Sequence, residues 1–186
     1  MLDTVKSRVN GLDLNALGQV VEAIEKDAEQ AKVSFDVTTR WKGQTRSETT
    51  VDGFTLAGER IRRSHKIVAD EPNELLGSDG APNPQELLMA AVNACMTVGY
   101  VAGAATKGIT LNALEIRTSG NLDLRGFLGL DDKVPAGYET LNYEVLIKGN
   151  GTPEQFEEIH QTVMKTSPNY FNLNRPIRMN GELKVG

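Results

Sequence analysis

Cysteine is almost absent from this sequence: its 186 residues contain one, Cys95. A single cysteine excludes an intramolecular disulfide framework and any all-cysteine metal site within one chain. Aromatic residues make up only 5% of the chain, and His65 and His160 are its two histidines. A carboxylate beside either histidine would not define a metal site. We therefore expect neither a metal nor a cofactor.

A basic excess is lacking as well, since 20 Lys and Arg face 25 Asp and Glu for a formal net charge of −5. Proteins that bind duplex nucleic acid normally carry a basic excess, so we expect no nucleic-acid partner. Residues 1–15 contain no apolar run before a small-residue cleavage site, and we expect no secretory signal there. These features predict a cytoplasmic protein whose chemistry depends on one thiol.

The length predicts a single domain over residues 1–186, with residues 1–32 as an N-terminal helical extension. Apolar residues spaced three and four apart predict a helix from Leu14 to Ala28, capped by Asp13. Asp52-Gly53 is a turn signal, and Thr152 with Gln155 starts a second capped helix. Alternating apolar residues predict antiparallel strands at 33–41, 45–51, 60–69, 111–118, 138–148 and Ile177–Val185.

The most informative segment is a helix that begins at Pro84. Asn83 is a suitable N-cap, and Glu86 completes a capping box. No charge occurs between Leu87 and Ala105, which is long enough to suggest a membrane span. The run consists largely of Ala, Gly, Asn and Thr, whose transfer into a membrane is weakly favourable. We therefore expect a central helix packed on all sides, and no membrane.

Four small residues follow one another at intervals of four along this helix: Ala91, Cys95, Gly99 and Gly103. Such a stripe lets another backbone approach closely. The partner is either another helix of the same chain or the same helix of a second copy in a symmetric dimer. Cys95 within the stripe is either a small buried hydrophobe or a reactive thiol activated by a nearby cation. Candidate cations are Arg46 and the basic residues of strand 60–66. The basic residues of that strand are also typical of a solvated sheet edge, which is the alternative interpretation.

Several short motifs carry a family resemblance. They are Asp70-Glu71-Pro72, Leu76-Gly77-Ser78-Asp79, residues 81–88 running into Ala94-Cys95, residues 122–129, and Ser167-Pro168. Together they resemble the OsmC/Ohr family (osmotically inducible and organic hydroperoxide resistance proteins), in particular an OsmC-like branch with a single cysteine. The resemblance implies an α+β fold with antiparallel sheets around a long central helix, in an intertwined homodimer.

The resemblance also implies a chemistry. The well-understood members are thiol peroxidases that reduce organic hydroperoxides, with an arginine and a glutamate that position and activate a peroxidatic thiolate. Cys95 matches that thiol, and Arg46 is preferred over Arg62 and Arg63 as the arginine. Gln85 holds the family's glutamate position, and Glu86, one residue later, is the candidate catalytic glutamate beside Cys95 and Arg46. Ser167 stands where two-cysteine members carry the resolving cysteine.

Two functions follow from this resemblance. The first is a hydroperoxide reductase with one cysteine, in which Cys95 reduces a small organic hydroperoxide and an external dithiol reductant restores it. The second is a non-catalytic OsmC-fold protein that binds a small apolar or thiol-bearing ligand near the dimer seam. A structural protein induced by stress is the third and simplest alternative, and at this point the sequence leaves open whether the chain is an enzyme.

Overall fold

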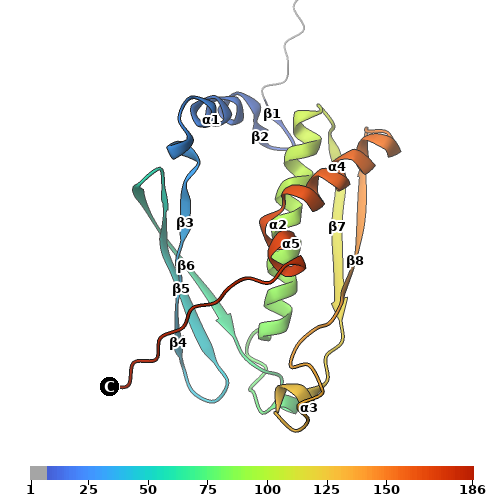
Figure 1. Ribbon diagram of the computed structural model, residues 1–186. Coiled ribbons are helices and arrows are strands. Elements are labelled where there is room, and N and C mark those ends of the chain that lie inside the picture. The colour runs from blue at the N-terminus through green and yellow to red at the C-terminus, as the bar shows by residue number, and fades with distance from the viewer. Residues whose placement is uncertain (1–7) are drawn as a thin grey trace, which may run out of the picture. The chain divides into compact units, whose positions relative to one another are not determined.

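The computed structural model describes residues 8–186, which form two compact units (Figure 1). The first unit ends at Ala90 and the second runs from Ala91 to Gly186, so that the boundary falls inside helix α2 (Pro84–Thr106). Residues 1–7, which belong to the predicted extension and to the segment searched for a signal, lie outside the described residues.

The first unit begins with a short hairpin of β1 (Arg8–Val9) and β2 (Leu12–Asp13). Its turn, Asn10-Gly11, has φ angles of 52° and 81°, the left-handed pair that a two-residue hairpin turn requires. Helix α1 (Leu14–Lys26) follows and is capped as predicted, because Asp13 accepts from the first backbone N–H groups. It ends two residues before the predicted Ala28, since a 3₁₀ turn, η1 (Ala28–Ala31), begins there.

A four-stranded antiparallel sheet makes up the rest of the first unit. Strand β5 (Ser47–Leu56) is central and pairs with β6 (Glu59–Ala69) along one edge. Along its other edge it pairs with β3 (Val33–Phe35) and β4 (Thr38–Trp41). The predicted strand 33–41 is therefore two strands. The break lies at a bulge, because β5 has three residues (51–53) between its paired positions there and the facing segment has two (36–37).

The Asp52-Gly53 turn prediction is wrong, because β5 continues through both residues. The hairpin turn is instead Ala57-Gly58, with φ angles of 49° and 81°. Gly53 sits at the bulge with φ of 155°, and a Cβ there would lie 2.4 Å from the carbonyl oxygen of Ile61. Glycine is thus required here for close approach of two strands, which gives the same sequence signal as a turn.

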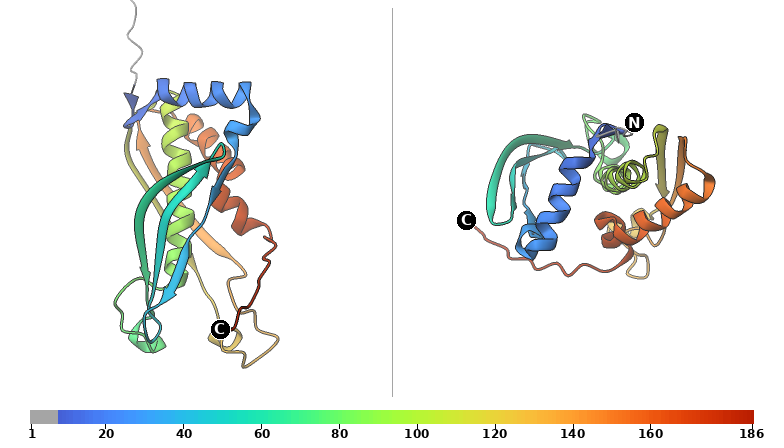
Figure 2. Two further views of the ribbon diagram at one scale, coloured as in Figure 1. Left: turned by 90° about the vertical axis from the view of Figure 1, so that its left-hand side faces the viewer. Right: turned by 90° about the horizontal axis from the view of Figure 1, so that it is seen from above.

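The second unit contains the remainder of α2, a β-hairpin and three further helices (Figures 1 and 2). Strands β7 (Leu111–Gly120) and β8 (Leu141–Gly149) pair in antiparallel register. Helix α4 (Pro153–Thr166) begins at the predicted capping box, and α5 (Pro168–Asn174) follows it directly. Both α2 and α4 pack on one face of the hairpin, around a core of Val92, Met96, Tyr100, Ala104, Ile109, Ile159 and Val163.

Helix α2 is only partly covered within its own unit, and packing on all sides stays a prediction that requires a further partner. Val92, Met96 and Tyr100 are buried, whereas Ala94 is exposed and Val98 is 69% exposed. By length and composition alone α2 could cross a bilayer, with a mean hydropathy of 1.6. Its buried stripe instead packs against the hairpin and α4 as the core of the second unit. Within the second unit, residues 91–186, the exposed stripe has no partner.

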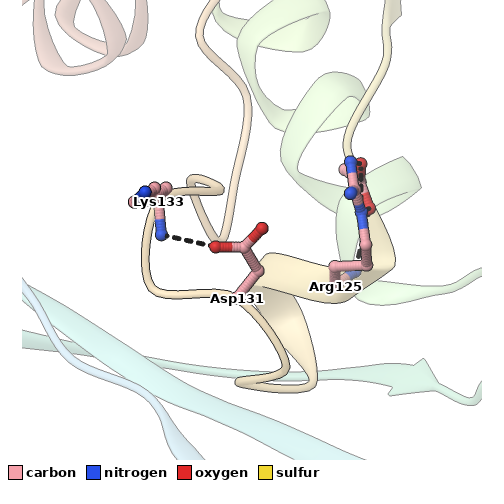
Figure 3. A network of polar contacts seen from close by, with 4 residues as sticks. Arg125, Asp131 and Lys133 are labelled. Atoms are coloured by element: carbon pink, nitrogen blue, oxygen red, sulfur yellow. Dashed lines mark hydrogen bonds and ion pairs between the residues drawn. The ribbon is translucent and has the colours of Figure 1, made fainter.

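The segment between β7 and β8 contains a single-turn helix, α3 (Leu124–Phe127), that the sequence analysis missed. Its polar residues contact one another (Figure 3): the Arg125 guanidinium binds the Asp123 carboxylate, and Asp131 accepts from the backbone N–H of Lys133. The Arg125 contacts lower the pKa of Asp123 to about 2. The apolar residues of the segment are exposed: Leu124, Phe127, Leu128 and Leu130.

The predicted terminal strand Ile177–Val185 is not a strand. Apolar and polar residues do alternate over it, and Ile177, Met179 and Leu183 are strongly exposed. A strand forms only where its backbone groups meet a neighbouring edge, and within residues 8–186 no edge pairs with this segment.

Candidate active site

The stripe of small residues on α2 packs against α4 and α5 of the same chain. A Cβ added to Gly99 would lie 3.0 Å from Cγ2 of Val163, and one added to Gly103 would lie 3.1 Å from Cγ2 of Ile159. Both partners are on α4, four residues apart, so they follow the same spacing as the glycines. The structure therefore decides between the two partners left open by the sequence, and the stripe is an intrachain contact.

Cys95 occupies the next position along this contact, where α4 ends and α5 begins. Its thiol is free and half-buried. The Ser167 hydroxyl donates to Cys95 Sγ at 3.3 Å, and the backbone N–H of Asn169 donates to the same atom at 3.5 Å. The sulfur therefore accepts two hydrogen bonds, both from the segment where α5 begins. Sequence analysis named candidate cations and noted Ser167 in place of a resolving cysteine, but it did not predict hydrogen-bond donors to the thiol.

The two donors are held in place by the local structure of α5. Ser167 is 4% exposed and is the N-cap of α5, whose Tyr170 N–H donates to its Oγ at 3.5 Å. Asn169 is anchored on the opposite helix, since its Nδ2 donates to the carbonyl oxygen of Ala91 at 2.9 Å. A serine followed by proline is a common helix start, so the Ser167-Pro168 pair could have predicted α5.

Glu86 does not face the thiol. Its carboxylate accepts from the backbone N–H of Asn83 at 2.8 Å, while Asn83 Oδ1 accepts from the backbone N–H groups of Gln85 and Glu86. This is the predicted capping box. Nine residues of helix separate Glu86 from Cys95, which corresponds to about 180° of rotation and roughly 13 Å along the axis. The role of Glu86 in catalysis stays a prediction, and capping α2 is what its contacts show.

Arg46 belongs to the first unit, in the turn between β4 and β5. Its Nη1 lies 2.8 Å from where a Cβ of Gly80 would be, so its guanidinium lies beside the loop that precedes α2. Two basic residues of β6 form ion pairs in the first unit, Arg60 with Asp36 and Lys66 with Glu48. The preference for Arg46 over Arg62 and Arg63 as the activating arginine stays a prediction.

Asp70 organises the loop that carries the first family motifs. Its side chain is fully buried and accepts from the hydroxyls of Ser78 and Thr45 at 2.5 and 2.7 Å, and from the backbone N–H groups of Glu71 and Gly80. The Ser78 and Thr45 hydroxyls are the main reason that the pKa of Asp70 lies far below its ordinary value. The motif residues thus have a structural role, which is to fix the loop leading into α2.

We expect Asp70→Asn to lower the Tm of unfolding, because an amide nitrogen would face donors that now find a carboxylate. Since the folded state lowers this pKa, the stabilisation is complete above about pH 4 and is lost as pH falls further. The Tm difference between wild type and variant should therefore be constant from pH 7 to 5 and shrink below pH 4. Thermal unfolding followed by circular dichroism measures it, with the exposed Asp132→Asn as control. An equal difference at pH 3 and pH 7 would refute this explanation.

Among residues 8–186, no group of three or more His, Cys, Asp or Glu side chains is arranged to hold a metal ion. The site is thus a thiol on a long central helix, next to two hydrogen-bond donors from a following helix pair, within an α+β fold of antiparallel sheets. This defines a class of protein built around one helix-borne cysteine.

Comparison with known proteins identifies the family. The family model described as OsmC-like protein matches residues 77–182, more than half of the chain. The chain belongs to the OsmC-like family, and its α+β fold with antiparallel sheets is the one predicted from the resemblance. A search of curated proteins finds no match.

Solved structures share the fold at low sequence identity. An OsmC-like protein from Mycoplasma pneumoniae is 18% identical with a TM-score of 0.57, covering 76% of this chain and 87% of that one. A putative osmotic stress induced and detoxification response protein from Psychrobacter arcticus is 14% identical with a TM-score of 0.56, covering 73% and 85%. An OsmC-like protein of unknown function from Vibrio cholerae is 16% identical with a TM-score of 0.55, covering 74% and 92%.

Proposed function

We propose that this protein reduces organic hydroperoxides through Cys95, as a cytoplasmic enzyme that uses an external thiol reductant. The observation that carries the proposal is the pair of donors, Ser167 Oγ and the Asn169 backbone N–H, on Cys95 Sγ. Membership of the OsmC-like family supports it, because the sequence resemblance matches Cys95 to the family's peroxidatic position. A single thiol also fits a reducing compartment.

The proposed reaction begins with the Cys95 thiolate. The sulfur attacks the terminal oxygen of the hydroperoxide, the O–O bond breaks, and the alkoxide leaves with a proton as the alcohol. Cys95 is thereby oxidised to a sulfenic acid. The donors on Sγ stabilise the charge on the sulfur before the attack and hold the thiolate in one orientation.

Recovery of the thiol must come from outside the chain, because Ser167 has no sulfur with which to form a disulfide. A dithiol attacks the sulfenic acid to form a mixed disulfide and release water. Its second thiol then displaces Cys95, which returns as a thiol while the dithiol leaves as its own disulfide. The dithiol is the reductant and the hydroperoxide the oxidant, so the electrons balance over one turnover.

The test is consumption of cumene hydroperoxide with dihydrolipoamide as reductant. Wild type should consume peroxide at a rate that rises with protein concentration, and Cys95→Ser should lower that rate to the uncatalysed background. Circular dichroism shows that the variant is folded. Equal slow rates for the two proteins would reject the enzyme and favour the second function, a ligand-binding protein. That function is supported by the engagement of Glu86 in the helix cap.

We also propose that the protein is a homodimer in which strands of the two chains intertwine. Three apolar surfaces support this: the exposed stripe of α2 at Ala94 and Val98, the exposed sheet residues Phe35 and Trp41, and the alternating segment 177–185. A second copy would cover the stripe and offer an edge with which the segment can pair. These surfaces differ from the stripe of glycines, whose partner is α4 of the same chain.

Light scattering should give a mass of about twice 20.3 kDa for the wild type at micromolar concentration. Val98→Glu places a charge in the middle of the exposed stripe, and we expect it to weaken association by at least tenfold because burying an uncompensated charge is costly. Thr106→Glu, at the exposed end of the same helix, serves as the control. A monomeric wild type would reject the dimer, and an unchanged Val98→Glu dimer would reject this interface.

A further inference from the structure

The second unit contains a pocket, separate from the thiol, in the crevice between α4 and β8. Its volume is about 350 Å³, within the range of roughly 300–1,000 Å³ typical of small-molecule sites. One wall comes from successive turns of α4 and the other from alternate residues of β8, and Tyr100 of α2 lines it as well. The lining residues are Tyr100, Tyr143, Val145, Ile147, Pro153, Phe156, Glu157 and His160.

The aromatic side chains of the pocket are fixed by contacts with one another. The hydroxyl of Tyr100 is hydrogen-bonded to Nδ1 of His160, and the two rings stack with centroids 6.0 Å apart. Tyr143 contacts His160 on one side, at 6.2 Å between centroids, and Tyr170 on the other, at 6.1 Å. The walls are therefore preformed, which lowers the entropic cost of binding a ligand.

Tyr100 and His160 have defined roles as donor and acceptor in their hydrogen bond. Tyr100 is 1% exposed, and burial raises the pKa of its phenol, so that the hydroxyl keeps its proton. Among residues 8–186, the partner of the Tyr100 hydroxyl is Nδ1 of His160. The hydroxyl therefore donates, and Nδ1 of His160 accepts.

One fixed charge belongs to the pocket, and it is negative. Glu157 lies at the exposed rim, and its Oε1 accepts from Gln161 Nε2 at 2.7 Å, which holds the carboxylate in place. Neither lysine nor arginine is among the lining residues. An anionic ligand would meet a like charge with no counter-charge, whereas a cation would pair with Glu157 and face the rings of Tyr143 and Phe156.

We propose that this pocket binds a small organic cation, an amine or quaternary ammonium group on an aromatic or short aliphatic body. The apolar body would lie between Phe156 and the β8 side chains, and the cationic end would reach Glu157. The proposal does not depend on Cys95 and stands or falls separately from the peroxidase.

Nuclear magnetic resonance of the histidine ring protons tests the proposal on the intact protein. The chain has two histidines, and His65 on β6 does not line the pocket, so its signals are an internal reference. Titration with 2-phenylethylamine should shift the His160 signals and leave those of His65 unchanged. The probes 2-phenylethanol and 3-phenylpropanoate, of similar size but neutral and anionic, should bind more weakly.

A matched pair of variants tests the role of the charge. Glu157→Gln should weaken binding of 2-phenylethylamine about threefold to fivefold, the size of an exposed cation–carboxylate or cation–π contact. Glu158→Gln removes the neighbouring carboxylate, which pairs with Lys107 at 2.8 Å and does not line the pocket, and should leave binding unchanged. Binding of 3-phenylpropanoate as tight as that of the amine, unmoved His160 signals, or equal effects of the two variants would each overturn the proposal.

Discussion

Ser167→Cys is expected to form a disulfide with Cys95 as soon as one equivalent of hydroperoxide has oxidised the thiol. Ser167 Oγ lies 3.3 Å from Cys95 Sγ, and a sulfur at that position needs to move by only about 1 Å to reach bonding distance. The new thiol attacks the Cys95 sulfenic acid and releases water. Because this step is intramolecular, turnover with a dithiol reductant should rise by about tenfold or more.

Non-reducing electrophoresis and mass spectrometry of the oxidised variant measure the disulfide. Thr166→Cys is the matched control, because Thr166 is exposed and its hydroxyl donates to Thr162 of the same helix. That variant should keep two free thiols under the same treatment. The loss of the serine cap of α5 should cost Ser167→Cys about 1 kcal/mol of stability, which unfolding checks separately. Two free thiols in oxidised Ser167→Cys would contradict the position assigned to this residue.

Gly99→Leu is expected to destabilise the folded chain by about 2–3 kcal/mol. A Cβ at this position already lies 3.0 Å from Val163 Cγ2, and the remaining carbons of leucine have no space between α2 and α4. The gain of about 1 kcal/mol from removing a glycine inside a helix offsets only part of this cost. Urea unfolding followed by circular dichroism gives the free energy of unfolding.

Two comparisons make the Gly99 experiment specific. Gly18 on α1 has nothing within 4 Å of its added Cβ, and Gly18→Leu should be neutral or stabilising by up to about 1 kcal/mol. Adding Val163→Ala to Gly99→Leu should recover part of the loss, because the two residues share one space. A Gly99→Leu protein as stable as wild type, or a double variant that recovers nothing, would show that α4 does not fill this stripe.

The sequence predicts local structure well where the signal itself is local. Asn83, Pro84 and Glu86 place the start of α2, and Thr152 with Gln155 places the start of α4, because a helix cap consists of residues a few positions apart. The same local reasoning applied to Ser167-Pro168 would have found α5. Fold class followed from the family resemblance rather than from any one element.

The sequence fails where the outcome depends on a distant partner. The alternating residues of 177–185 have the pattern of a strand, but pairing depends on an edge supplied elsewhere. The Asp52-Gly53 pair is typical of a turn in sequence. In the structure it lies at a bulge, where the carbonyl oxygen of Ile61 approaches Gly53 closely. The glycine stripe similarly predicts a close contact without naming its partner, which is Ile159 and Val163 of α4.

Some residues of the candidate site could likewise be predicted from the sequence, and others could not. Cys95 was singled out as the only cysteine and Ser167 through the resemblance, and the structure brings their side chains together. The Asn169 backbone N–H could not be predicted, because a backbone donor leaves no signature in the sequence and its position depends on how α5 begins. Glu86 illustrates the converse, since a carboxylate suited to catalysis is engaged in a helix cap.

The central claim is that Cys95 is a reactive thiol, and its most direct test is trapping of the sulfenic acid. The folded wild-type protein is treated with one equivalent of cumene hydroperoxide in the presence of dimedone, and the modified residue is located by mass spectrometry. We predict a dimedone adduct on Cys95 in the folded protein, formed faster than on glutathione under the same conditions. A Cys95 thiol that stays unmodified until the protein is unfolded would contradict the claim.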